Sequence, residues 1–119
     1  MTRRILIGAA IFAALLAVEC GGSGPTSTSG GPGPDEVWMQ NLSFVPATRT
    51  VGVLTTITWT NKDSMDHTVT SGTPGNPEGK FASAVLAPNQ TFMHTFNDAG
   101  VYPFYCSIHT FMTGTIKVE

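Results

Sequence analysis

The chain has 119 residues, of which 41% are hydrophobic and 12% charged, and its formal net charge is −2. That length allows one folded domain rather than two. The few Lys and Arg residues form no basic patch, so nucleic acid is not an expected partner. We expect the protein to be a monomer.

The first residues have the pattern of an export signal. Arg3 and Arg4 precede an apolar run without a charge, Ile5 to Val18, which is too short to span a bilayer comfortably. A basic start followed by such a run is typical of a secretory signal peptide, which we assign to residues 1–19. The alternative is a retained membrane helix. The signal predicts an exported protein, in the periplasm or at the cell surface.

Cys20 stands where the apolar run ends, and its surroundings resemble the lipobox of bacterial lipoproteins. In that motif the cysteine becomes the lipidated N-terminus, which would tether the protein to a membrane surface. Glu19 departs from the motif, which prefers a small residue at that position. The alternative is ordinary cleavage nearby, which would leave Cys20 free or in a disulfide.

Residues 21–34 contain only Gly, Ser, Thr and Pro. Such a segment cannot bury a core and is typical of a flexible tether. We therefore divide the exported chain into a tether over residues 20–36 and a folded domain over residues 37–119.

The folded part shows short strand patterns separated by turns. Apolar residues alternate from Val37 to Phe44, and residues 50–60 are rich in β-formers that place Val51, Val53, Ile57 and Trp59 on one face. Residues 71–79 are expected to be a loop, and strands are predicted at 67–70, 91–96, 101–105 and 114–118. No stretch has a helical period, so the fold class is all-β, an antiparallel Greek-key sandwich or barrel.

Residues 101–112 contain the clearest chemical signal. Cys106, His109 and Met112 follow one another at intervals of three. Each could be ordinary, because buried cysteines are common and methionine fills gaps in cores. With His67 as a fourth candidate, however, the set is a thiolate, two imidazoles and a thioether. That is the ligand set of a blue-copper site, whereas a thioether suits zinc poorly.

Two other possibilities concern the remaining cysteine and histidine. In an oxidising compartment Cys20 and Cys106 could form a disulfide, but the place of Cys106 within a His/Met cluster favours a protected thiolate. His94 alternates with Phe92 and Phe96. We expect it on the core face or at a sheet edge rather than on a metal.

These residues resemble those of the cupredoxins, the small blue-copper proteins of the plastocyanin and azurin group. The likeness covers most of residues 37–119, and the Cys-x-x-His-x-x-Met loop is similar to that of the amicyanins. It rests on Trp59-Thr60-Asn61, Met65-Asp66-His67, Gly100-Val101-Tyr102, and Cys106 to Met112 followed by Gly114. The resemblance implies the cupredoxin type of fold and one type 1 copper ion, bound by His67, Cys106, His109 and Met112.

The resemblance also implies roles for residues around the copper. Asn61 would tie the loop of the first ligand to the cysteine loop by hydrogen bonds. Asp66, where relatives often have proline, would place a carboxylate near the copper and favour Cu(II). Ser107 is expected beside the site as well. By contrast, Lys62, Asp63 and Glu78 have the composition of a solvated surface.

A partner surface follows from the same likeness. The electron would leave through the exposed ring edge of His109, and Met65, Ile108 and Phe111 would form an apolar rim that docks redox partner proteins briefly. Alternatively, these three side chains only cover the copper.

The expected function is a one-electron carrier that cycles between Cu(II) and Cu(I). The alternative is a copper chaperone or storage protein that binds Cu(I), although the five methionines are dispersed rather than clustered. An enzymatic role is not expected, because copper oxidases and nitrite reductases need further histidine-rich centres and the chain has only three histidines.

Overall fold

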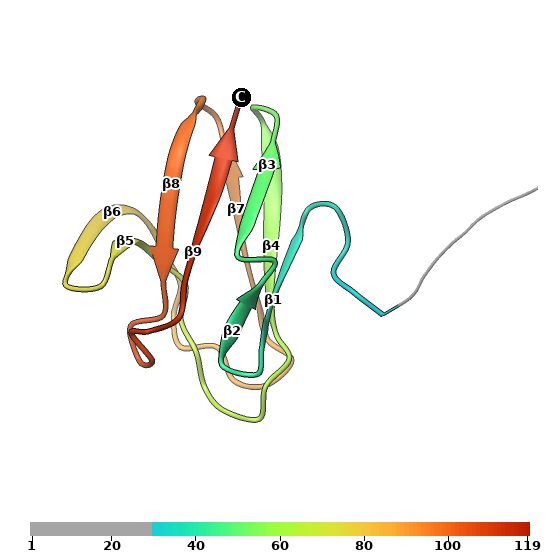
Figure 1. Cartoon of the computed structure of the whole chain (residues 1–119), viewed down its shortest axis with the longest axis vertical. Helices are drawn as coiled ribbons and strands as arrows, with labels where there is room; N and C mark the ends of the chain where they lie inside the picture. Colours follow the sequence, from blue (N-terminus) through green and yellow to red (C-terminus); the bar gives the residue numbers. More distant parts are fainter. Residues whose placement is uncertain (1–29) are drawn as a thin grey trace, which may run out of the picture. The chain divides into compact units, whose positions relative to one another are not determined.

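The computed structural model describes residues 30–119. The predicted signal peptide, Cys20 and most of the predicted tether therefore lie outside the described residues. One compact unit covers Pro32–Glu119, and its nine strands form two facing sheets (Figure 1). Residues 30–119 contain no helix of the length and hydropathy needed to cross a membrane.

The two sheets are mixed. The first has the order β2-β1-β4-β7, with bounds Ser43–Val45, Glu36–Gln40, Thr55–Asn61 and Thr91–Phe96. The second has the order β3-β9-β8-β5-β6, with bounds Thr48–Val51, Thr113–Val118, Gly100–Tyr105, Thr70–Thr73 and Asn76–Ala82. The all-β sandwich is confirmed. It is not purely antiparallel, because β1 runs parallel to β4 and β3 runs parallel to β9.

The run predicted as one strand over residues 37–44 is a tight hairpin. Asn41 and Leu42 connect β1 to β2 with φ angles of 55° and 57°. Two consecutive left-handed residues form the kind of turn that matches the twist of a two-residue hairpin. As a result Val37 and Met39 are fully buried, whereas Trp38 faces outward and lies under the ammonium of Lys62, 4.7 Å from the ring centroid.

The segment 50–60 is also divided, at a turn between β3 and β4. Ile57 and Trp59 are fully buried, as predicted, but Val53 is 46% exposed because it lies in the turn. The next residue, Leu54, has φ 69° and ends the turn. The prediction of a loop over residues 71–79 is wrong, because these residues form much of the β5–β6 hairpin.

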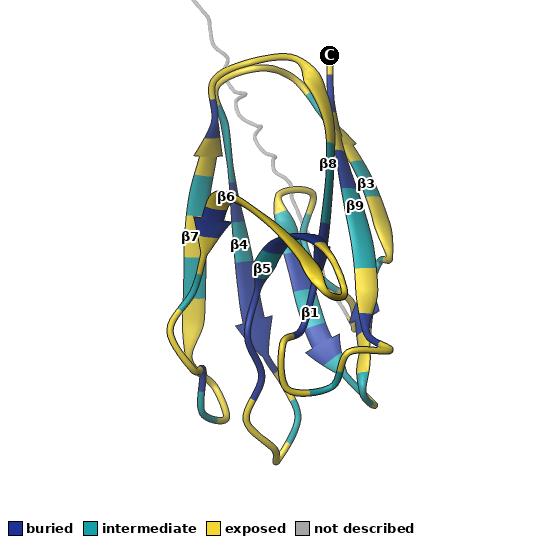
Figure 2. Ribbon diagram, turned by 90° about the vertical axis from the view of Figure 1, so that its left-hand side faces the viewer, coloured by how far each residue is buried: buried dark blue, intermediate teal, exposed yellow. Residues whose placement is uncertain are grey.

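Trp59 is the centre of the core between the two sheets. Its ring lies 5.4–6.4 Å, centroid to centroid, from those of Phe81, Phe92, Phe96 and Phe104. The buried residues of β1, β4 and β5 lie on the inside of the sandwich, while β6 is almost wholly exposed (Figure 2). This aromatic packing forms a rigid base for the loops at the ends of the strands.

His94 packs against this core, as predicted. Its ring lies 4.8 Å from the rings of both Phe81 and Phe96. Partial burial lowers the pKa of His94 below its ordinary value, because the protonated ring is poorly solvated there.

Candidate metal centre

Two loops meet at the end of the sandwich opposite the C-terminus (Figure 1). The loop after β4 contains His67, and the loop after β8 contains Cys106, His109 and Met112. The antiparallel pairing of Thr70 with Tyr105 places β5 beside β8, so the residues next to that pair become neighbours. This register explains why His67 and Cys106 meet although they are 39 residues apart in the sequence.

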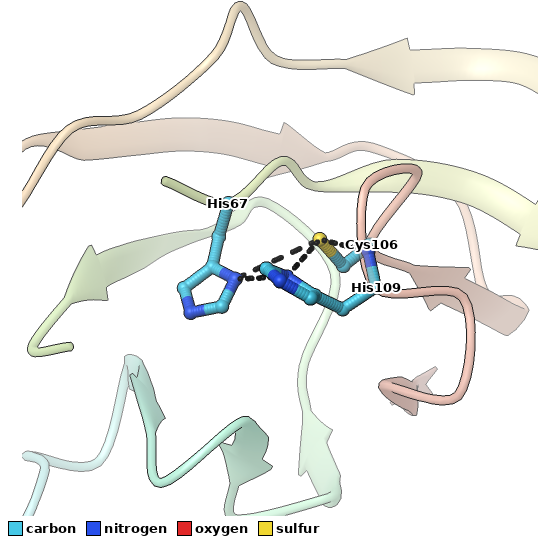
Figure 3. Close-up of side chains that lie close together, drawn as sticks. All are labelled: His67, Cys106 and His109. Atoms are coloured by element: carbon cyan, nitrogen blue, oxygen red, sulfur yellow. Dashed lines mark hydrogen bonds between the residues drawn. The ribbon is translucent and has the colours of Figure 1, made fainter. Parts of the chain in front are cut away.

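Three donor atoms from these loops point toward one another (Figure 3). The Nδ1 of His67 lies 3.8 Å from the Sγ of Cys106, and the Nδ1 of His109 lies 4.0 Å from that sulfur. The two Nδ1 atoms are 3.2 Å apart. His67 and Cys106 are fully buried, whereas His109 is partly exposed. Cys106 forms no disulfide within residues 30–119.

The donor atoms fit one metal ion. Two imidazole nitrogens that bind the same first-row ion at about 2.0–2.1 Å stand about 3.3–3.6 Å apart. The observed Nδ1–Nδ1 distance of 3.2 Å is close to that, and the donor atoms of the three residues all lie within 4.8 Å of one another. A thiolate with two imidazoles in a buried site suits copper.

Met112 lies in the same loop and is 2% exposed. Its amide donates a hydrogen bond of 2.9 Å to the carbonyl of His109, and its carbonyl accepts one of 3.1 Å from the amide of Cys106. The ligand loop is therefore closed on itself, and Met112 returns to the base of the loop as part of the buried core cluster.

Asp63 orients His67. The Nε2 of His67 lies 2.8 Å from Oδ2 of Asp63, whose carboxylate also accepts hydrogen bonds from the amides of Asn41 and Leu42, at 2.7 and 3.0 Å. Burial acts to raise the pKa of Asp63, but the hydrogen bonds from Leu42, His67 and Asn41 outweigh it and leave that pKa lowered. An ionised carboxylate only accepts, so Nε2 carries the proton and Nδ1 is free to bind metal.

The expectation that Asp63 belongs to a solvated surface is therefore wrong, since its side chain is only 14% exposed. The sequence did not reveal this role of Asp63, because the segment Asn61-Lys62-Asp63-Ser64 has the polar composition of an exposed turn. A possible signal was its spacing of four residues from His67.

Asn61 has a different set of contacts from the one expected. Its Nδ2 donates to the carbonyls of Met65 and Leu86, at 2.7 and 2.9 Å, and its Oδ1 accepts from the amide of Asp63 at 2.9 Å. These bonds hold the loop of His67 and fasten it to residue 86. They do not reach the cysteine loop.

Thr68 provides the link between the two ligand loops. Its amide donates to the Sγ of Cys106 at 3.4 Å, and its hydroxyl accepts from the amide of Ser107 at 2.8 Å. The hydroxyls of Thr68 and Ser107 also lie 2.8 Å apart, so Ser107 does lie beside the site. The position of Thr68, directly after His67, was the signal that could have identified it.

The other predicted site residues are on the surface. Asp66 is exposed to solvent. Met65 and Ile108 are each 47% exposed and Phe111 is 68% exposed. The ring of Phe111 lies 6.1 Å from that of His109, centroid to centroid. These apolar side chains come from both ligand loops.

A two-sheet β-sandwich with one buried cysteine and two histidines, presented by loops at one end, defines a mononuclear copper protein. The family model described as copper-binding proteins of the plastocyanin/azurin family matches residues 35–119, and the chain belongs to that family. The fold is thus the cupredoxin fold, the site binds one type 1 copper ion, and the class of function is blue-copper electron transfer.

Individual relatives agree with this assignment. Amicyanin-alpha of Methylorubrum extorquens is 30% identical over 87 residues, which cover 73% of each chain. Amicyanin of Paracoccus versutus is 29% identical over 83 residues, 70% of this chain and 63% of that protein. A purple cupredoxin from Nitrosopumilus maritimus has a solved structure that is similar with a TM-score of 0.66 and 30% identity, over 71% of this chain and 98% of that one.

Proposed function

We propose that this protein is a one-electron carrier whose copper is held by His67, Cys106, His109 and Met112. The observation that supports this most directly is the convergence of the Cys106 sulfur and the two Nδ1 atoms within 4.8 Å. Met112 is added because it is buried at the base of the same loop. When bound, the copper supplies a centre that alternates between Cu(II) and Cu(I).

The chain's own residues limit how far the site can rearrange. The amides of Thr68 and His109 each donate a hydrogen bond of 3.4 Å to the Cys106 sulfur, which stabilises negative charge on it. Asp63 holds His67, and the closed ligand loop holds His109 and Met112. Contacts of this kind fix ligand orientation, so an electron can be exchanged with little reorganisation.

The surface around His109 suits brief docking. His109 is the partly exposed member of the donor set, and the ring of Phe111 lies 6.1 Å from its ring, centroid to centroid. Met65 and Ile108 add exposed apolar area on the same two loops. Redox encounters use small, weak interfaces, which an apolar rim of three side chains can provide. Partner proteins would bind here and receive the electron through the ring edge of His109.

The predicted signal peptide and Cys20 support a location outside the cytoplasm. In this proposal residues 1–19 direct export, Cys20 bears the lipid anchor, and residues 20–36 tether the domain over 37–119 to the membrane surface. Mass spectrometry of the protein purified from membranes tests it. A lipid-modified N-terminal Cys20 is expected, and a mature chain that lacks Cys20 would contradict the anchor.

The visible spectrum of the copper-loaded protein tests the electron-carrier function. The expected result is intense absorption of the Cu(II) form, which disappears on one-electron reduction and returns on reoxidation. Cys106→Ser is expected to abolish the colour, while Cys20→Ser, the matched change at the other cysteine, retains it. A colourless protein that binds only Cu(I) would instead support a chaperone or storage role.

A further inference from the structure

We propose that Asp63 is the positioning residue of this copper centre, and that it fastens His67 to the β1–β2 turn. The inference rests on the same copper site as the proposed function. It assigns the electrostatic influence on that site to Asp63 rather than to the neighbouring carboxylate of Asp66, and it makes the distant turn at Asn41-Leu42 part of the metal centre.

The first observation is the number of groups that hold the Asp63 carboxylate. Oδ1 accepts from the amide of Asn41 at 2.7 Å, and Oδ2 accepts from the amide of Leu42 at 3.0 Å. Oδ2 also accepts from Nε2 of His67 at 2.8 Å. Both turn residues have positive φ, and consecutive amides in such a turn point the same way and form a small anion-binding concavity.

The second observation is that the backbone around Asp63 is fixed as well. The amide of Asp63 donates to Oδ1 of Asn61 at 2.9 Å, and the amide of Lys62 donates to the carbonyl of Met39 at 2.8 Å. The carboxylate therefore cannot follow His67 if the ring moves. It holds the imidazole plane relative to β1, which is one of the buried strands of the core.

The third observation separates the two carboxylates. The side chain of Asp63 is 14% exposed and hydrogen-bonded to the imidazole of His67, whereas the side chain of Asp66 is exposed to solvent. Water screens an exposed charge strongly, and a hydrogen-bonded carboxylate raises the basicity of the histidine that it contacts. Asp63 therefore favours Cu(II) binding and a lower reduction potential much more than Asp66 does.

The experiment compares Asp63→Asn with Asp66→Asn, which removes the same charge three residues away. Loss of a carboxylate that contacts a ligand histidine typically costs about 10–100-fold in metal affinity. We expect a loss of that size in Cu(II) affinity for Asp63→Asn, together with a raised reduction potential. Asp66→Asn is expected to raise the potential only slightly and to keep the affinity within about threefold, as for a screened charge.

A second measurement does not depend on copper. In the copper-free protein, amide hydrogen exchange at Asn41 and Leu42 is expected to accelerate in Asp63→Asn and to stay unchanged in Asp66→Asn. Asp63→Glu, which keeps the charge, is expected to recover part of the Cu(II) affinity. This recovery distinguishes a charged positioning residue from a side chain that only fills space.

The possible results separate this inference from the proposed function. If the wild-type protein is blue and redox-active but both Asn variants bind Cu(II) equally well, the role of Asp63 is wrong and the electron-carrier function stands. If the wild-type protein forms no coloured Cu(II) site, the proposed function fails whatever the variants do. Unchanged exchange at Asn41 and Leu42 in Asp63→Asn would also overturn the inference.

Discussion

The backbone amide of Thr68 donates a hydrogen bond of 3.4 Å to the sulfur of Cys106, which lies 38 residues further along the chain. Together with the hydroxyl contact of Thr68 to Ser107, at 2.8 Å, this bond joins the two ligand loops. A single residue thus supports the cysteine loop through both its backbone and its side chain.

Replacing Thr68 by Val tests the side-chain part of this link, because the shape is kept and the hydroxyl is lost. Thr68 is 5% exposed, and the amide of Ser107 loses its acceptor. The free energy of unfolding of the copper-free protein is expected to fall by about 1–3 kcal/mol. Urea unfolding measures it, with Thr68→Ser as the control that retains most of the stability. Equal stability of all three proteins would contradict this role.

Met112 is expected to influence the reduction potential through the strength of its donor atom. Replacement by Gln offers an amide oxygen, a harder ligand that favours Cu(II), so the potential is expected to fall. Replacement by Leu removes the donor and is expected to raise it. Protein-film voltammetry of the two variants gives both values. Shifts in the same direction for Gln and Leu would show that Met112 acts by packing alone.

Phe111 is expected to contribute to partner docking rather than to stability. It is 68% exposed, so Phe111→Ala should change the free energy of unfolding by less than about 0.5 kcal/mol. The bimolecular electron-transfer rate with the partner is expected to fall about fivefold or more, as for loss of an apolar anchor worth about 1 kcal/mol. Val101→Ala is the matched control, because Val101 is 60% exposed and lies at the start of β8, far along the strand from Cys106.

The partial burial of His94 predicts that the free energy of unfolding depends on pH. The pKa of His94 is lowered in the folded protein by burial, so the unfolded chain takes up the proton first as the pH falls below about 6.5. Protonation therefore favours unfolding, and stability is lost from that pH downward until the folded-state pKa is passed.

The His94→Phe variant isolates this contribution, because His67 and His109 are present in both proteins. The free energy of unfolding of the copper-free protein, measured at pH 7 and at pH 5, is expected to decrease less in the variant than in the wild type. An equal decrease in the two proteins would show that burial of His94 has no effect on acid stability.

The strands whose predictions were correct are those with uninterrupted alternation. Residues 91–96 coincide with β7, and residues 101–105 and 114–118 fall within β8 and β9. Two predictions failed where a turn contains leucine with a positive φ angle. Leu42 and Leu54 have positive φ, which leucine rarely adopts, so neither residue gives warning of a turn. The two runs at 37–44 and 50–60 therefore appeared continuous.

The sequence by itself determined which ligand types are available, their spacing in one loop, and the β character of the domain, because these depend on residue identity and local periodicity. Only the tertiary structure decided which polar residues support the metal centre. Asp63 and Thr68 act through partners 21 to 39 residues away, and those contacts depend on strand register and on the β1–β2 turn. Local sequence patterns do not encode such register, because it is set by packing of the two sheets across the whole core.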